Sequence, residues 1–132
     1  MGHSIQTVGT RTEIFNDCDL LLLLRLFGEV IRKKPELDPA IAAMRDYWDD
    51  CCQGYGPGLI HLRLADLAAT GSAKEALLRF FDDVEAELRS FGTTIPAKTI
   101  RERFRVRGVV FNDQDVSRIL SALVRLRRLV EP

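Results

Sequence analysis

Several side chains that could contact a charged partner lie close together in the first half of the chain. Asp46, Tyr47, Asp49, Asp50 and Tyr55 fall within ten consecutive positions. Carboxylates beside aromatic rings are common in surfaces that bind proteins, because a carboxylate pairs with Lys or Arg while the ring supplies contact area. These five residues are therefore a candidate partner-binding surface.

The three aspartates are expected near the C-terminus of a helix. A carboxylate there opposes the helix dipole and costs roughly a few tenths of a kcal/mol. Folding alone does not account for such a placement, which favours contact with a basic partner.

The same carboxylates do not predict catalysis. Asp49 and Asp50 are adjacent, so on a helix they point about 100° apart and cannot form an acid–base pair alone. The sequence also contains no Gly-rich phosphate loop, no H-E-x-x-H and no G-x-S-x-G motif. We therefore predict that the protein is not an enzyme and needs no cofactor.

The cysteines predict neither a disulfide framework nor a metal site. Cys18, Cys51 and Cys52 are an odd set with two members adjacent, and they lack the C-x-x-C spacing that would support a metal site with His61. Buried free thiols in a cytoplasmic protein are expected. The apolar run Leu20–Leu24 is too short to cross a membrane.

The charges are balanced over the whole chain but not along it. The formal net charge is zero. Residues 1–92 hold 10 Lys and Arg against 15 Asp and Glu, a net of −5, whereas residues 93–132 hold 9 against 4, a net of +5. A charge separation of this size can steer charged partners.

Residue patterns predict an all-α fold, an irregular bundle of about six helices in a single domain over residues 15–132. Residues 1–14 are expected to be a mobile or irregular lead-in. A first, central helix should start at Asn16 or Asp17 and end before Pro35. A second should start at Asp38-Pro39 and carry a buried stripe that ends at Cys51.

Turn and cap residues predict the boundaries of the later elements. Residues 59–69 fit both a strand and a helix, and their length and alanine content favour the helix. Ser72 and Glu75 form a capping box for a helix that stops at Gly92. A further helix should open at Thr94-Pro96 and close at Gly108, and Asn112 or Asp113 should cap the last one. The expected core contains Leu22, Leu26, Trp48, Leu77, Phe81, Leu88, Phe104 and Leu120.

Residues 95–104, a break at Gly108 and residues 115–132 together resemble the second and third helices of a winged helix-turn-helix domain. In that family a helix with the rhythm V-S-R-x-L-x-x-L enters the major groove of DNA. The resemblance implies a DNA-binding regulator as one possible function. The nucleic-acid contacts that it implies are Arg101, Arg105, Ser117, Arg118, Ser121 and Arg125.

Residues 77–100 followed by residues 108–126 resemble small α-helical immunity proteins of bacterial contact-dependent and type VI toxin systems. The matching features are Phe91-Gly92, the helix that starts at Ile95, and the linker from Gly108 to Phe111. This resemblance implies a cytoplasmic protein-binding module that neutralises a cognate toxin, with a basic toxin domain as the partner. It is the leading functional prediction, and the DNA-binding regulator is the alternative.

Overall fold

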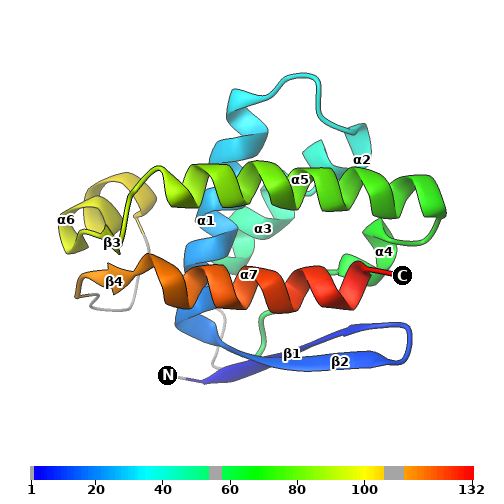
Figure 1. Cartoon of the computed structure of the whole chain (residues 1–132), viewed down its shortest axis with the longest axis horizontal. Helices are drawn as coiled ribbons and strands as arrows, with labels where there is room; N and C mark the ends of the chain where they lie inside the picture. Colours follow the sequence, from blue (N-terminus) through cyan, green and yellow to red (C-terminus); the bar gives the residue numbers. More distant parts are fainter. Residues whose placement is uncertain (1, 54–57, 106–111) are drawn as a thin grey trace.

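Three long helices form the framework of the structure, a computed structural model that describes residues 2–53, 58–105 and 112–132. They are α1 (Asp17–Lys33), α5 (Gly71–Arg89) and α7 (Val116–Val130). Helices α5 and α7 run antiparallel beside each other and cross α1 (Figure 1). The short helices are α2 (Pro39–Ala42), α3 (Arg45–Cys51), α4 (Leu64–Leu67), α6 (Ala97–Thr99) and the π-helix η1 (Ile100–Phe104).

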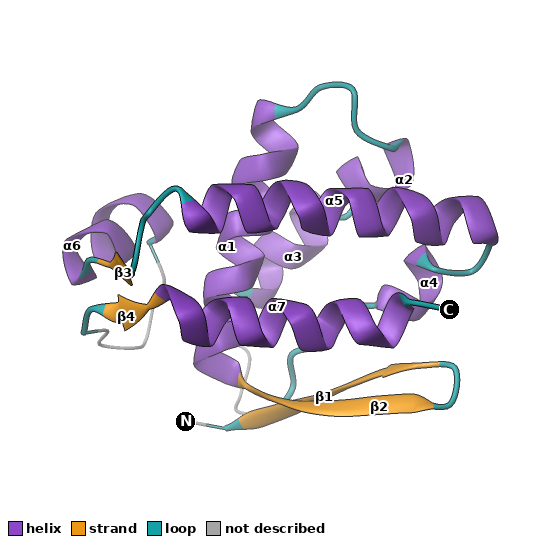
Figure 2. Cartoon of the chain, in the orientation of Figure 1, coloured by secondary structure: helices purple, strands orange, loops and turns teal. Residues whose placement is uncertain are grey.

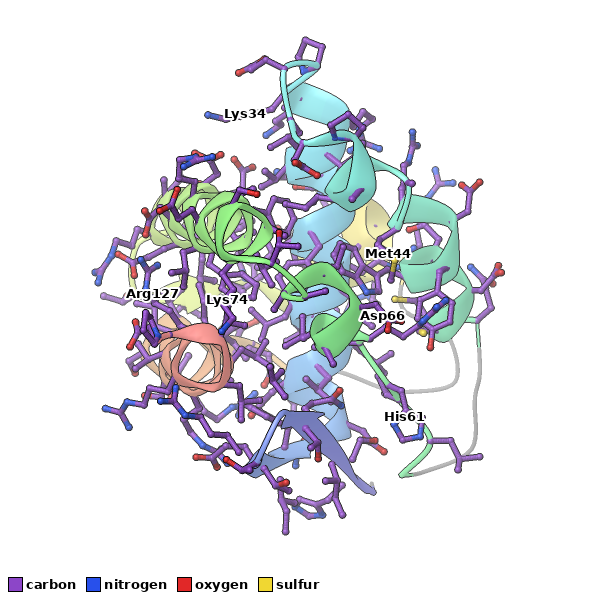
Figure 3. The ribbon with its side chains drawn as sticks, turned by 90° about the vertical axis from the view of Figure 1, so that its right-hand side faces the viewer. Lys34, Met44, His61, Asp66, Lys74 and Arg127 are labelled. Atoms are coloured by element: carbon purple, nitrogen blue, oxygen red, sulfur yellow. The ribbon has the colours of Figure 1, made fainter. Side chains whose placement is uncertain are left out.

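Helix α1 is the centre of the molecule, as its leucine run predicts. The Asn16 side chain accepts a hydrogen bond from the Cys18 amide and caps its first turn. All five leucines of Leu20–Leu24 are buried, so the helix is covered on nearly every side. It lies between α3 on one side and α5 with α7 on the other (Figure 3).

The all-α prediction is wrong, because the chain also forms two small antiparallel sheets (Figure 2). Strands β1 (His3–Val8) and β2 (Arg11–Asn16) pair as a hairpin, and β3 (Thr94–Ile95) pairs with β4 (Gln114–Asp115). Of the described residues, about 61% are helical and 13% are in strands. The expected irregular lead-in is thus mostly a hairpin that packs against α7, α4 and α1.

The hairpin is held to the rest of the protein by polar side chains on its inner face. Gln6 donates from Nε2 to the Ile60 carbonyl at 2.6 Å, and its Oε1 accepts from the Leu62 amide at 2.9 Å. The Ser4 hydroxyl accepts from the Ile60 amide at 3.1 Å and donates to the Asp17 carboxylate. These bonds satisfy the backbone of residues 60–62, which runs beside β1 without pairing with it.

Other boundaries differ from their predictions in ways that local hydrogen bonds explain. The second helix is two helices, because a turn at Ala43 and Met44 separates α2 from α3. Residues 59–63 have no regular secondary structure, and the helix predicted there is only the short α4. Thr70 caps α5 in place of Ser72, since its hydroxyl accepts from the Ala73 amide.

The start of α7 also lies later than predicted. Asp115 is its N-cap residue, and Asp113 instead accepts a hydrogen bond from the Ala97 amide at the start of α6. Gly92 follows the C-terminal end of α5, as predicted. Its φ of 81° is positive, a conformation that favours glycine. Gly108 and the linker through Phe111 lie outside the described residues.

The predicted core is confirmed at every position but one. Leu22, Leu26, Trp48, Leu77, Phe81, Leu88 and Phe104 are at most 2% exposed. Leu120 is only partly buried at the edge of the core. Phe27 and Phe80 complete an aromatic cluster with Trp48 and Phe81 that joins α1, α3 and α5.

Candidate functional site

Helix α3 carries most of the predicted partner-binding residues, and its orientation is fixed by Trp48. The indole ring is buried against Phe27 on α1, with ring centroids 5.0 Å apart, and its Nε1 donates to the Leu62 carbonyl at 3.0 Å. Trp48 is therefore a core residue, and the opposite face of α3 is exposed.

Asp46 and Asp50 lie on that exposed face, four residues apart and hence on the same side of the helix. Neither carboxylate forms an ion pair or a hydrogen bond with any residue in the described part of the chain. Because α3 starts at Arg45, Asp46 lies in its first turn, where the helix dipole favours a carboxylate. The prediction that all three aspartates oppose the dipole is therefore wrong for Asp46 and holds for Asp50.

Asp49 points away from this surface, toward α1. Its carboxylate lies 3.7 Å from Arg25 Nη1 and 4.0 Å from Arg45 Nε. Both distances exceed that of an ordinary hydrogen bond, so these are loose ion pairs. Asp49 thus belongs to a neighbouring polar cleft and not to the outward acidic face.

Tyr47 is half-buried at the border of the acidic face. Its hydroxyl donates to the His61 carbonyl at 2.8 Å, and the Arg63 guanidinium lies 5.3 Å from its ring centroid. Tyr55 lies outside the described residues. Of the five predicted residues, the structure therefore brings Asp46 and Asp50 together on one surface with Tyr47 beside them. We call Asp46, Tyr47 and Asp50 the α3 acidic face.

Two of the predicted DNA contacts are ion-paired within the chain. Arg118 Nε lies 3.1 Å from the Asp19 carboxylate, and Arg125 Nη2 lies 2.8 Å from that of Glu13. The Arg125 guanidinium also lies 4.6 Å from the Phe15 ring centroid. These contacts fasten α7 to α1 and to the hairpin.

The remaining residues of that prediction are exposed. Ser117 and Ser121 lie on the outer side of α7, where the Ser121 hydroxyl donates to the Ser117 carbonyl at 3.0 Å. Arg101 belongs to η1 and Arg105 follows it. In Figure 3, Arg127 of α7 lies on one side of the molecule. Met44, which directly precedes α3, lies on the opposite side. Helices α7 and α3 therefore lie on opposite sides of α1.

The structure also contains a polar cleft that the sequence interpretation missed. It has a volume of about 620 Å³ and lies between α1, α3 and η1. Arg25, Gly28, Glu29 and Arg32 line it from α1, at the i, i+3, i+4 and i+7 positions of one helical face. A polar stripe on an otherwise apolar central helix is a signal that could have revealed this cleft.

The cysteines are free thiols, two of them buried. Burial raises the pKa of the Cys52 thiol to about 12, and it also raises the pKa values of Cys18 and Cys51. A thiol with a raised pKa has little of the reactive thiolate at neutral pH. Only Cys18 is partly exposed.

We expect a thiol reagent at pH 8 to modify Cys18 in the folded protein and to leave Cys51 and Cys52 unmodified. Colorimetric titration should find about one reactive thiol per folded chain and all three after denaturation. In a Cys18→Ser variant the folded protein should show almost none. Rapid labelling of that variant would mean that the region around Cys51 and Cys52 opens easily.

Comparison with protein-family models, curated proteins and solved structures finds no significant match. Among the described residues, no three His, Cys, Asp or Glu side chains converge as metal ligands. No described helix is long and apolar enough to span a membrane.

Proposed function

We propose that this protein is a cytoplasmic protein-binding module of the immunity type, which neutralises a basic toxin domain through the α3 acidic face. The observation that carries the proposal is that the Asp46 and Asp50 carboxylates are exposed and unpaired among the described residues. Both are exposed on one side of a helix whose other side is anchored by Trp48, and neither has a counterion among the described residues. A basic partner would supply the missing counterions.

The arrangement of charge supports a protein partner over DNA. Helix α3 lies across α1 from α7, so a basic domain could approach α3 without meeting the arginines of α7. DNA binding through α7 would require Arg118 and Arg125 to exchange Asp19 and Glu13 for phosphates. The chain as a whole carries no net positive charge to favour that exchange.

Charge reversal at Asp46→Lys and Asp50→Lys together should weaken binding to the basic toxin domain by at least about 2 kcal/mol, or roughly thirtyfold. The loss arises because each lysine would face a Lys or Arg of the partner. The fold should be nearly unaffected, since the effects of the two changes on the helix dipole have opposite signs. Calorimetry against the toxin encoded beside this gene would measure the affinity.

The matched control is Glu36→Lys with Glu75→Lys, which changes the charge equally at two exposed carboxylates outside α3. This variant should keep most of the affinity, apart from a general electrostatic effect on the association rate. Thermal melting of both variants verifies folding. Equal affinities for the two folded variants would contradict the proposed surface, and a gene neighbourhood without a toxin would contradict the immunity role.

A further inference from the structure

The cleft between α1, α3 and η1 concentrates positive charge in a chain that has no net charge. Its lining contains three carboxylates, which are Glu29, Asp49 and Glu102. Five arginines from three separate parts of the sequence surround them: Arg25, Arg32, Arg45, Arg103 and Arg105. Among the described residues, the lining therefore has two more cations than anions, and every one of these cations is a guanidinium group.

One of the three lining carboxylates, Glu29, is already paired closely with one arginine. Arg103 donates from Nε and Nη2 to the two oxygens of the buried Glu29 carboxylate, at 2.7 and 2.6 Å. It also contacts Glu87 on α5 at 3.0 Å. This paired fork is structural, because it ties η1 to α1 and α5. Among the described residues, the other four arginines have only the remaining carboxylates of the lining, and a long contact to Glu29, as possible counterions.

Those remaining pairs are loose. Arg32 lies 4.0 Å from Glu29, Arg45 lies 4.0 Å from Asp49, and Arg25 lies 3.7 Å from Asp49. Arg105 forms no ion pair with any residue in the described ranges. An incoming anion could therefore bind without breaking a short ion pair.

Arg25 is the most informative of these side chains. It is only 15% exposed, and its Nε is buried without a hydrogen-bond partner among the described residues. Its Nη2 donates to the Arg105 carbonyl at 3.3 Å, a long contact. A buried N–H donor without an acceptor, such as Arg25 Nε, is destabilising unless another acceptor satisfies it.

The backbone beside Arg25 is also unusual. Residues Ile100–Phe104 form a π-helix, and Arg105 follows in the left-handed region with φ of 51°. Short π-helices and non-glycine residues with positive φ are both uncommon, and both occur frequently at functional sites. Here they bring Arg103 and Arg105 to the mouth of the cleft.

We propose that this cleft binds a small phosphate-bearing molecule. Planar guanidinium forks match phosphate oxygens, and several forks that approach from different helices suit an anion with many oxygens. The volume of about 620 Å³ exceeds what one phosphate ion fills and falls within the range of ligand sites. Among the described residues, Phe104 is the one aromatic residue of the lining and is 2% exposed, so we assign the recognition to the phosphate groups.

Titration calorimetry with pyrophosphate at low ionic strength tests the site. The wild-type protein should bind with a stoichiometry of one, and affinity should fall as salt screens the arginines. Arg45→Gln should weaken binding about tenfold, because it removes one charge-assisted contact. Arg79→Gln is the matched control, since Arg79 is exposed on α5 outside the cleft.

A second pair of variants separates binding from folding. Arg105→Gly removes a guanidinium and relieves a left-handed conformation, so it should weaken pyrophosphate binding about tenfold without lowering the melting temperature. Arg63→Gly is the control: it also removes a guanidinium and relieves a left-handed conformation among the described residues. Because Arg63 lies outside the cleft, this variant should leave pyrophosphate binding unchanged.

A parallel titration with ADP identifies the source of the phosphate. Tighter binding of ADP than of pyrophosphate supports a nucleotide, and the reverse order supports a ligand without a base. Absence of binding by both, or equal binding by Arg45→Gln, Arg105→Gly and their controls, would overturn the proposal. Because Asp46 and Asp50 do not line the cleft, this result is independent of the toxin-binding experiment.

Discussion

Replacing Phe81 with Ala should lower the free energy of unfolding by about 3–5 kcal/mol, as expected for removal of a large side chain from a packed core. Phe81 is fully buried, and its ring centroid lies 6.0 Å from that of Phe27 and 6.3 Å from that of Phe80. These rings join α5 to α1, so the cavity would open where the two long helices meet. Urea denaturation would measure the loss.

The neighbouring residue Leu78 supplies the control for Phe81. It lies on the same helix but is only partly buried at the edge of the core. Leu78→Ala should therefore cost about 1–2 kcal/mol, because the site can relax into solvent and leaves little cavity. If Phe81→Ala cost no more than this control, the ring would not fill the core as the structure shows.

The parts of the fold that follow from helical periodicity could be predicted from the sequence. The start of α1 at Asp17, capped by Asn16, and its central position are both confirmed, since a cap residue and a leucine run are local signals. The expected core positions Leu77, Phe81 and Leu88 on α5 are confirmed for the same reason. These signals require no knowledge of distant contacts.

The sequence pattern does not predict the hairpin because its buried face is polar and its exposed face is apolar. A half-buried strand usually directs apolar side chains inward, but here Ser4 and Gln6 are buried while the paired Ile5 and Ile14 are more than half exposed. The sequence pattern therefore lacks the usual alternation for a core-facing strand. Apart from the Ser4–Asp17 bond, the inward polar residues bond to Ile60 and Leu62, more than fifty positions later, and no local pattern predicts those contacts.

Caps were misplaced where several candidates compete. Thr70 and Ser72 both could cap α5, and Asn112, Asp113 and Asp115 all could cap α7. Tertiary contacts decide the outcome: Asp113 is used by α6 across the β3–β4 pair, which leaves Asp115 for α7. A short polar side chain near a helix start is therefore a weak guide to the boundary itself.

The candidate sites illustrate the same limit. The acidic character of residues 46–50 could be read from the sequence, but the turn at Ala43 and Met44 decides that Asp49 faces Arg25 and not the solvent. The arginine cleft is assembled from residues up to eighty positions apart, such as Arg25 and Arg105. The polar stripe on α1 could have indicated one wall of the cleft, whereas its partners on α3 and η1 depend on the packing.

Gln6→Leu should lower the free energy of unfolding by about 3 kcal/mol, although it keeps the volume of the side chain and makes it more apolar. The reason is that it leaves the Ile60 carbonyl and the Leu62 amide buried without partners, and each such group costs about 1–3 kcal/mol. Thr7→Ala is the control on the same strand, because its hydroxyl bonds to Thr12 in solvent and its loss should cost under about 0.5 kcal/mol. Urea denaturation of both variants decides the matter. Equal stability of Gln6→Leu and wild type would mean that the hairpin does not contribute to the stability of the rest of the fold. The expected loss would instead mean that the polar face of the hairpin is part of the core, which supports α3 through the Trp48–Leu62 hydrogen bond.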